Sequence, residues 1–129
     1  MKKLNSIIIL LFLFSLAANG CSSEDSTYNS INVDQLKKEI KENPNMIILD
    51  VRTPEELAGP LGHIDGVINI PLQNLEDRIT ELDKYKDKKI NVICRSGNRS
   101  GKASAILFEK GFNVSNVEGG MKAYRQSDK

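Results

Sequence analysis

The chain has 129 residues, which is enough for one compact domain once any targeting segment is set aside. With 40% hydrophobic and 27% charged residues, no Trp and 4 Pro, its composition excludes a collagen-like chain and a wholly disordered one. The net charge is +1, and it becomes −1 without Lys2 and Lys3, when 16 basic residues face 17 acidic ones. That balance argues against a nucleic-acid partner.

Residues 1–20 have the pattern of a signal peptide. Lys2 and Lys3 form a basic start, and residues 7–18 form an apolar run interrupted only by Ser15. This run is shorter than the roughly 20 apolar residues that span a bilayer as a helix. We therefore favour a cleaved signal peptide over a retained transmembrane anchor.

The segment that follows (ANGCSS, residues 18–23) places Cys21 directly after a small residue, and it resembles a bacterial lipoprotein cleavage site. This resemblance implies that Cys21 is lipidated and that residues 21–29 are a polar tether. We expect an exported protein, held by its lipid at the outer face of a bacterial membrane or in the periplasm, that touches the membrane only through this anchor. A soluble secreted form remains the alternative.

In the rest of the chain, apolar runs of strand type alternate with stretches of helical periodicity. A capping box at Asn32 and Gln35 predicts a helix that Pro44 ends, with three apolar residues on one face (Val33, Leu36 and Ile40). Residues 46–49 predict a strand buried on both faces, whose carboxyl end brings residues 50–56 near a functional edge.

The second half of the chain continues the alternation. A surface helix is expected over residues 74–83, where the apolar positions are Leu75, Ile79 and Leu82. A second buried strand, residues 90–93, runs into Cys94, and a helix then follows that Gly111 closes, with Phe112 packing behind it. A last strand is expected at 113–117. Strands alternating with helices predict an α/β fold with a parallel sheet and helices on both faces.

Cys94 is the only Cys left if Cys21 is lipidated, so it has no disulfide partner and is either buried and inert or reactive. It stands between a strand and a loop rich in Gly and polar residues that leads into a helix. Loop and helix N–H groups in this arrangement favour an anion, and neighbouring Arg side chains add to the effect. We therefore expect a nucleophilic thiolate at Cys94.

Four segments resemble signatures of the rhodanese family of sulfurtransferases, in the right order and spacing over residues 31–125. They are LDVRTPEE (49–56), GHIDGVINIP (62–71), CRSGNRS (94–100) and VEGGM (117–121), the last followed by Tyr124 where the family usually has Trp. The resemblance implies a rhodanese-like three-layer α/β/α domain over residues 30–127, with a five-stranded, mainly parallel sheet. It also implies transfer of sulfane sulfur through a persulfide on Cys94, with no cofactor and no metal.

The resemblance assigns the substrate-binding and persulfide-binding loop to the residues after Cys94, namely Arg95, Ser96, Gly97, Asn98, Arg99 and Ser100. Arg99 would structure the loop and Arg95 would face an anionic donor, although both could be solvated charges. Asp50, Arg52 and His63 would support the site from outside the loop. For Asp50 and Arg52 an ion pair that fixes a turn is the alternative, and for His63 a role in a turn.

The expected partners are a small sulfur donor, such as thiosulfate or a persulfide, and an external thiol or cyanide as acceptor. We expect a monomer. The alternative function is a rhodanese-like binding or sulfur-carrier module without turnover of small molecules. A phosphatase or arsenate reductase is less favoured, because the loop from Cys94 to Arg99 reads C-x4-R, whereas phosphate-binding relatives resemble C-x5-R and need the longer loop to enclose a tetrahedral oxyanion.

Overall fold

The structure is a computed structural model that describes residues 27–129. The signal peptide expected at 1–20, the lipidation expected at Cys21 and most of the expected tether lie outside the described residues. Strand β1 (Asn29–Ile31) begins at the last residue of that tether segment. Within residues 27–129, no helix combines the length and the apolar composition needed to cross a membrane.

Five strands form one sheet, in the order β1-β5-β4-β2-β3, and every neighbouring pair is parallel. Besides β1 they are β2 (Ile47–Asp50), β3 (Ile68–Asn69), β4 (Lys89–Ile93) and β5 (Asn113–Val117). The parallel five-stranded sheet inferred from the sequence resemblance is confirmed. Strands β1 and β3, which the sequence analysis did not identify, have only three and two residues.

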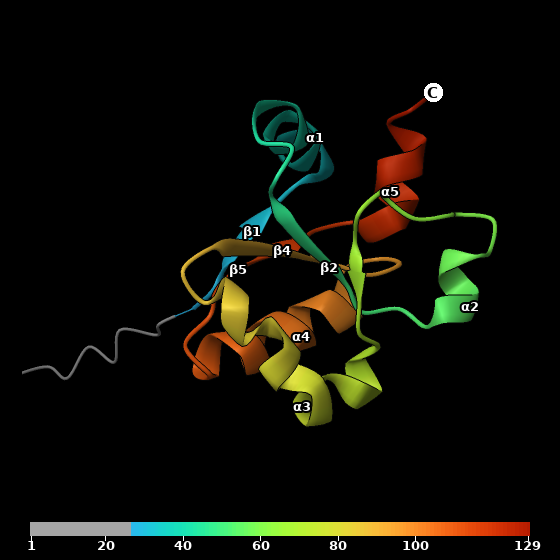
Figure 1. The fold of residues 1–129 in the computed structure, drawn as a ribbon. Helices are drawn as coiled ribbons and strands as arrows, with labels where there is room; N and C mark the ends of the chain where they lie inside the picture. Colours follow the sequence, from blue (N-terminus) through green and yellow to red (C-terminus); the bar gives the residue numbers. More distant parts are fainter. Residues whose placement is uncertain (1–26) are drawn as a thin grey trace, which may run out of the picture.

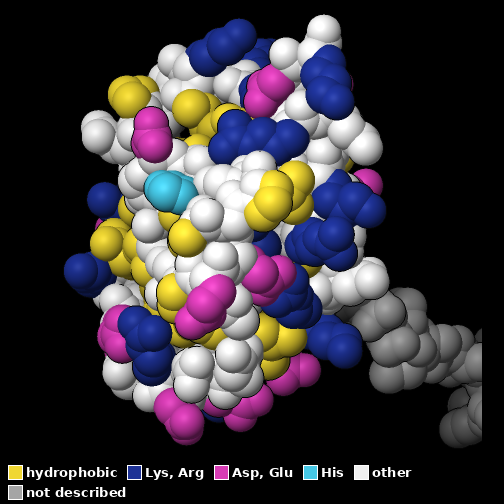
Figure 2. All heavy atoms as spheres, turned by 90° about the vertical axis from the view of Figure 1, so that its right-hand side faces the viewer, with side chains coloured by type: hydrophobic (Ala, Val, Ile, Leu, Met, Phe, Trp, Pro, Cys, Tyr) yellow, Lys and Arg dark blue, Asp and Glu magenta, His cyan; other side chains and the backbone are white. Residues whose placement is uncertain are grey.

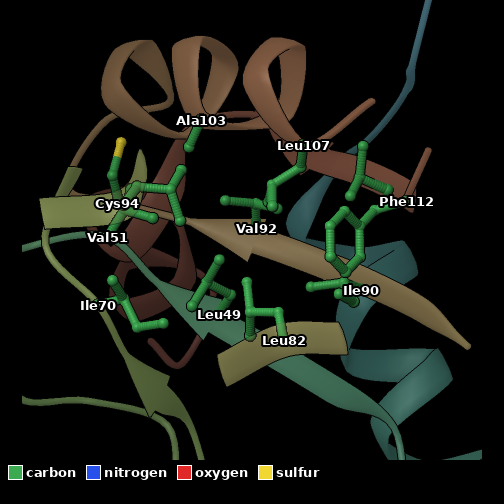
Figure 3. Close-up of a cluster of buried hydrophobic side chains, with 12 residues drawn as sticks. Leu49, Val51, Ile70, Leu82, Ile90, Val92, Cys94, Ala103, Leu107 and Phe112 are labelled. Atoms are coloured by element: carbon green, nitrogen blue, oxygen red, sulfur yellow. The ribbon is translucent and has the colours of Figure 1, made fainter. Parts of the chain in front are cut away.

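Helices cover both faces of the sheet, which gives the expected three layers (Figure 1). Helices α1 (Val33–Glu42) and α5 (Gly120–Gln126) lie on one face, and α3 (Leu75–Arg78) and α4 (Asn98–Glu109) on the other, with the short α2 (Pro54–Leu57) at one side. A buried apolar cluster fills each interface. The cluster beneath α4 includes Leu49, Val92 and Leu107, and Cys94 lies at its end (Figure 3).

Two local signals read from the sequence are present as predicted. The side chains of Asn32 and Gln35 each accept a hydrogen bond from the backbone N–H of the other at 2.9 Å, which caps α1. At the end of α4, Gly111 has φ +86°, and Phe112 donates its N–H to the Leu107 carbonyl at 3.0 Å with its ring buried. This is the hydrogen-bond pattern of a Schellman cap.

The continuous helix expected over residues 74–83 is not observed. The chain instead forms a 3-10 turn (Leu72–Asn74), the four-residue α3 and a second 3-10 segment (Ile79–Tyr85). Ile79, Leu82 and Tyr85 all pack against the cluster beneath α4, and their three-residue spacing brings them to one side of a 3-10 helix, whose side chains repeat every three residues. The apolar face was correctly predicted, but the helix type was not.

Candidate active site

Cys94 follows the last residue of β4 directly, at the carboxyl edge of the sheet where parallel α/β proteins commonly bind ligands. Residues 95–97 turn the chain into α4, which begins at Asn98. The sulfur points toward the first turn of α4 (Figure 3), and the residue as a whole is only 1% exposed. A buried sulfur with loop atoms around it allows these atoms to control its ionisation.

Two donors contact the sulfur. The Gly97 N–H lies 3.1 Å from Cys94 Sγ, and the Ser100 hydroxyl lies 3.3 Å from it. Ser100 Oγ also lies 3.1 Å from the Gly97 carbonyl oxygen, so its single proton is available to either acceptor. Burial raises the pKa of the Cys94 thiol. The Ser100 hydroxyl and the nearby N–H groups of residues 100, 97 and 96 lower it, and the resulting pKa lies below the usual value.

The first residues of α5 donate backbone hydrogen bonds to the Cys94 loop. Met121 N–H donates to the Cys94 carbonyl at 2.8 Å, and Lys122 N–H donates to the Arg95 carbonyl at 3.0 Å. This approach requires glycine at position 120, where φ is +55° and an added Cβ would lie 2.5 Å from the Cys94 carbonyl oxygen. The sequence analysis did not connect this helix with the site, because hydrogen bonds between distant backbone segments leave no local signal.

Arg99 is bound to Glu56 and not to the sulfur. Its guanidinium donates to both carboxylate oxygens of Glu56 at 2.7 Å each. Glu56 also accepts the Thr53 N–H at 3.0 Å as part of the capping box of α2. The Arg99 hydrogen bonds are the main reason that the pKa of Glu56 falls to about 2. Residues 50–56 thus lie beside the Cys94 loop as expected, and Arg99 fastens the first turn of α4 to α2.

Asp50 and Arg52 form a buried ion pair, with residue exposures of 0% and 1%. Arg52 donates to Asp50 through Nε at 3.0 Å and through a terminal nitrogen at 2.7 Å, and it reaches the Gly62 carbonyl at 2.8 Å. The pair therefore fixes the course of the chain from β2 to residue 62. This geometry matches the alternative given in the sequence analysis, in which Asp50 and Arg52 form an ion pair that fixes a turn.

His63 lies at the surface. Its Nδ1 is 3.4 Å from the Leu57 carbonyl oxygen, and its own carbonyl accepts a hydrogen bond from Arg125 at 3.1 Å. No hydrogen bond within residues 27–129 joins the His63 ring to the Cys94 loop. The structure places this side chain in the segment between α2 and β3, as the alternative role in a turn implies.

An open cavity of about 480 Å³ lies beside the Cys94 loop. It is lined by Arg52, Glu55, Glu56, Gly59, Pro60, Leu61, Arg95 and Lys122. Figure 2 views the side of the molecule that carries α2 and α5, where Lys and Arg side chains gather over the upper and right-hand parts. The sequence analysis anticipated Arg95 here but missed Lys122, although this residue directly follows the VEGGM segment.

No group of three or more His, Cys, Asp or Glu side chains in residues 27–129 is arranged to hold a metal ion. The donors around Cys94 are N–H and O–H groups, which suit a thiolate or another anion. The arrangement is therefore suited to holding a negatively charged sulfur.

The family model of the rhodanese-like domain matches residues 32–127. The chain belongs to this family. Among the relatives of this rhodanese-like protein, a sulfurtransferase of Allochromatium vinosum is 32% identical over 97 residues, which are 74% of this chain and 87% of the relative. The thiosulfate sulfurtransferase PspE of Escherichia coli is 38% identical over 74 residues, which are 57% of this chain and 69% of PspE.

The fold assignment is confirmed by solved structures. A rhodanese-related protein of Thermoplasma volcanium superimposes with a TM-score of 0.69 at 40% identity, over 78% of this chain and 93% of the other. Longer proteins also contain a matching segment: a tRNA uridine(34) hydroxylase of an Enterobacter species is 31% identical, but the match covers only 31% of its length. The comparisons thus establish a rhodanese-like domain that has sulfurtransferases among its relatives.

Proposed function

We propose that this protein is a rhodanese-type sulfurtransferase that carries sulfane sulfur on Cys94, from thiosulfate or a persulfide donor to a thiophilic acceptor. The observation that carries the proposal is the buried sulfur of Cys94 with the Gly97 N–H at 3.1 Å and the Ser100 hydroxyl at 3.3 Å. These donors keep the pKa of the thiol below its usual value, so the nucleophilic thiolate forms more readily.

In the first half-reaction the Cys94 thiolate attacks the outer sulfur of thiosulfate. A bond forms between Sγ and that sulfur, and the sulfur–sulfur bond of thiosulfate breaks with its electron pair leaving on sulfite. The product is an anionic persulfide on Cys94. The N–H groups of residues 96, 97 and 100 that lower the thiol pKa would also hold this negative charge, and exposed Arg95 would attract the doubly charged donor.

In the second half-reaction a nucleophile such as cyanide attacks the outer sulfur of the persulfide. The new bond gives thiocyanate, and the bond to Sγ breaks with its electron pair returning to Cys94 as thiolate. No proton has to be removed from Cys94 in either step once the thiolate has formed. For that reason the position of His63 away from the loop is compatible with the proposal.

Loop length favours sulfur over phosphate as the transferred group. Four residues separate Cys94 from Arg99, and the Arg99 guanidinium is engaged by Glu56 at 2.7 Å. A loop that encloses a tetrahedral phosphoryl group needs inward N–H donors around three oxygens and a cation aimed at them. The short Cys94 loop and the paired Arg99 suit a single sulfur atom better.

The decisive experiment measures thiosulfate:cyanide sulfur transfer by the purified protein and by Cys94→Ala. We expect steady turnover from the wild type and none from the variant. Cys21→Ala, which removes the other Cys, serves as the matched control and should keep full activity. Undiminished turnover by Cys94→Ala would overturn the assignment of the nucleophile, whereas a persulfide that forms but never turns over would indicate a sulfur-carrier module instead.

A further inference from the structure

The described chain enters the sheet at its amino edge, where the parallel strands begin, opposite the carboxyl edge that carries Cys94. Asn29, the first residue of β1, is paired with Ser115 in β5, and Ser115 is paired with Asn91 in β4. Residues 27 and 28 therefore precede the sheet on the side where β4 and β5 begin, whereas Cys94 follows the last residue of β4. Figure 1 shows the start of β1 on one side of the sheet and the loop that leads into α4 on the other.

Residues 27 and 28 are held against the end of α4. Tyr28 packs against the cluster beneath this helix. Thr27 and Tyr28 also line a hollow together with Ala105, Phe108 and Glu109, and Glu109 is the last residue of α4. The point at which the preceding segment joins the domain is therefore fixed at the amino edge of the sheet.

The distance that this preceding segment can cover is short compared with the domain. The six peptide links from Cys21 to Thr27 reach at most about 21 Å, whatever course they take. A domain of about 100 residues has a radius of gyration of about 13 Å, and a sphere with that radius of gyration is about 33 Å across. A lipid on Cys21 would therefore hold the amino edge near the membrane, and the segment is too short to let the Cys94 edge turn toward it.

Three exposed lysines lie in two turns at the amino edge. Lys86 and Lys88 are in the turn before β4, and Lys110 is in the turn before β5. We call these three residues the basic edge. The two turns are neighbours, because β4 and β5 are paired from their first residues and Lys86 Nζ lies 5.2 Å from the centroid of the Phe112 ring.

The basic edge keeps a positive charge that the domain does not neutralise. Lys86 forms an exposed ion pair with Asp83 at 3.3 Å, but no ion pair within residues 27–129 involves Lys88 or Lys110. Asp87 is the one carboxylate in the two turns, so three lysines against one aspartate give a net charge of +2. The chain without its first 20 residues has a net charge of −1, so the other residues sum to −3.

We propose that the basic edge rests on anionic lipid headgroups of the membrane that holds the lipid of Cys21, and that Cys94 faces away from this membrane. Each lysine near an anionic bilayer surface strengthens binding by about fivefold. This contact adds a protein surface to the lipid anchor, and sulfur donors and acceptors then reach Cys94 from the aqueous side. The orientation requires lipidation of Cys21 and is independent of the proposed sulfur transfer.

Fluorescence quenching measures this orientation in the full-length lipidated protein. A fluorophore is attached to one new cysteine, Asn45→Cys or Glu118→Cys, in a Cys94→Ala background. Asn45 is exposed in the turn before β2, at the amino edge, and Glu118 is exposed directly after β5, at the carboxyl edge. The labelled proteins are reconstituted into phosphatidylglycerol vesicles that contain lipids with nitroxide headgroups.

We expect the label at position 45 to be quenched about threefold or more strongly than the label at 118, because a five-residue strand separates the two edges by about 16 Å. Replacing phosphatidylglycerol with zwitterionic phosphatidylcholine should lower this ratio by about twofold or more, since the attraction of the lysines is lost. Lys88→Gln combined with Lys110→Gln should lower the ratio in phosphatidylglycerol to the phosphatidylcholine value. Lys102→Gln combined with Lys122→Gln removes the same charge from exposed positions outside the basic edge and should leave the ratio unchanged.

Equal quenching of both labels, or stronger quenching at position 118, would overturn the proposal. An unchanged ratio in the Lys88 and Lys110 double variant, or an equal fall in the control pair, would also overturn it, because the orientation would then not depend on the basic edge. A protein without lipid on Cys21 would reject the proposal at its premise. Thiosulfate:cyanide turnover by the unlabelled wild type tests the proposed function separately.

Discussion

Arg99, in the first turn of α4, binds the Glu56 carboxylate through two hydrogen bonds of 2.7 Å each. The two residues are 43 positions apart, so this pair joins the Cys94 loop to α2 and to the wall of the cavity behind it. The Arg99 guanidinium therefore holds the Cys94 loop in position through Glu56 and makes no hydrogen bond to the sulfur.

Glu56→Gln should destabilise the protein by about 1–2 kcal/mol at neutral pH, because a half-exposed charge-assisted pair is lost. The pKa of Glu56 is lowered from 4.5 to about 2, so the pair stabilises fully above pH 4.5 and its contribution disappears as the pH falls toward 2. Urea unfolding at neutral and at acidic pH checks this. The difference between wild type and variant should shrink in acid, and a constant difference would contradict the assigned role.

Ser100→Ala should raise the pKa of Cys94, because the hydroxyl that lies 3.3 Å from Sγ stabilises the thiolate. The pH profile of sulfur transfer should move to higher pH, and the rate on the acidic side should fall by roughly threefold to tenfold. Titration of the thiolate by ultraviolet absorbance measures the pKa directly. Ser96→Ala is the control, since its side chain makes no hydrogen bond to the sulfur in the described structure; equal shifts in both variants would argue against the hydroxyl.

Gly120→Ala should lower stability by about 1–3 kcal/mol and reduce transfer, because both its positive φ and the 2.5 Å approach to the Cys94 carbonyl oxygen oppose a side chain. Gly66→Ala is a matched comparison, since φ is +79° there but no atom lies within 4 Å of the added Cβ. Thermal unfolding of both variants separates backbone strain from the clash with the loop. If both variants lose the same stability and activity, the close approach of α5 to the Cys94 carbonyl does not explain the effect of Gly120→Ala.

Cys21→Ala tests the anchoring that we propose from residues 18–23, which lie outside the described residues. The variant should accumulate as precursor or as a product without lipid, and it should leave the detergent phase of a membrane extract. Ser22→Ala changes the neighbouring residue and should partition as the wild type does. Retention of Cys21→Ala in the detergent phase would exclude lipid anchoring through this residue.

Local signals in the sequence predicted the parts of the fold that depend on neighbouring residues. The capping pair Asn32 and Gln35 and the turn at Gly111 were correct, because each brings its own hydrogen-bond partners within a few positions. β1 and β3 were missed because two or three residues carry no periodicity, and their pairing depends on distant strands. The 3-10 segment Ile79–Tyr85 was missed because apolar residues spaced three or four positions apart can form one face of either an α-helix or a 3-10 helix.

In the candidate active site, too, the sequence predicted the features that depend on neighbouring residues and missed those that depend on distant contacts. The sequence pointed to residues 94–100 as the loop and to residues 50–56 as its neighbours, because both follow strands that end at one edge of a parallel sheet. It could not pair Arg99 with Glu56 or place the amides of α5 behind Cys94, since these contacts depend on how helices pack over the sheet. The place of Lys122 beside the site depends likewise on the tertiary fold, because it lines one cavity together with Arg95 and residues 59–61.

The first strand, β1, pairs with the last strand, β5, and the α5 helix that follows β5 donates hydrogen bonds to the backbone of the Cys94 loop. During synthesis, residues 29–31 leave the ribosome long before their partner strand exists, so the sheet cannot be finished from its first strand outward. The carbonyls of Cys94 and Arg95 also lack their amide partners until residues 121 and 122 have been made. The backbone of the Cys94 loop thus obtains its last hydrogen-bond partners only when α5 has been made.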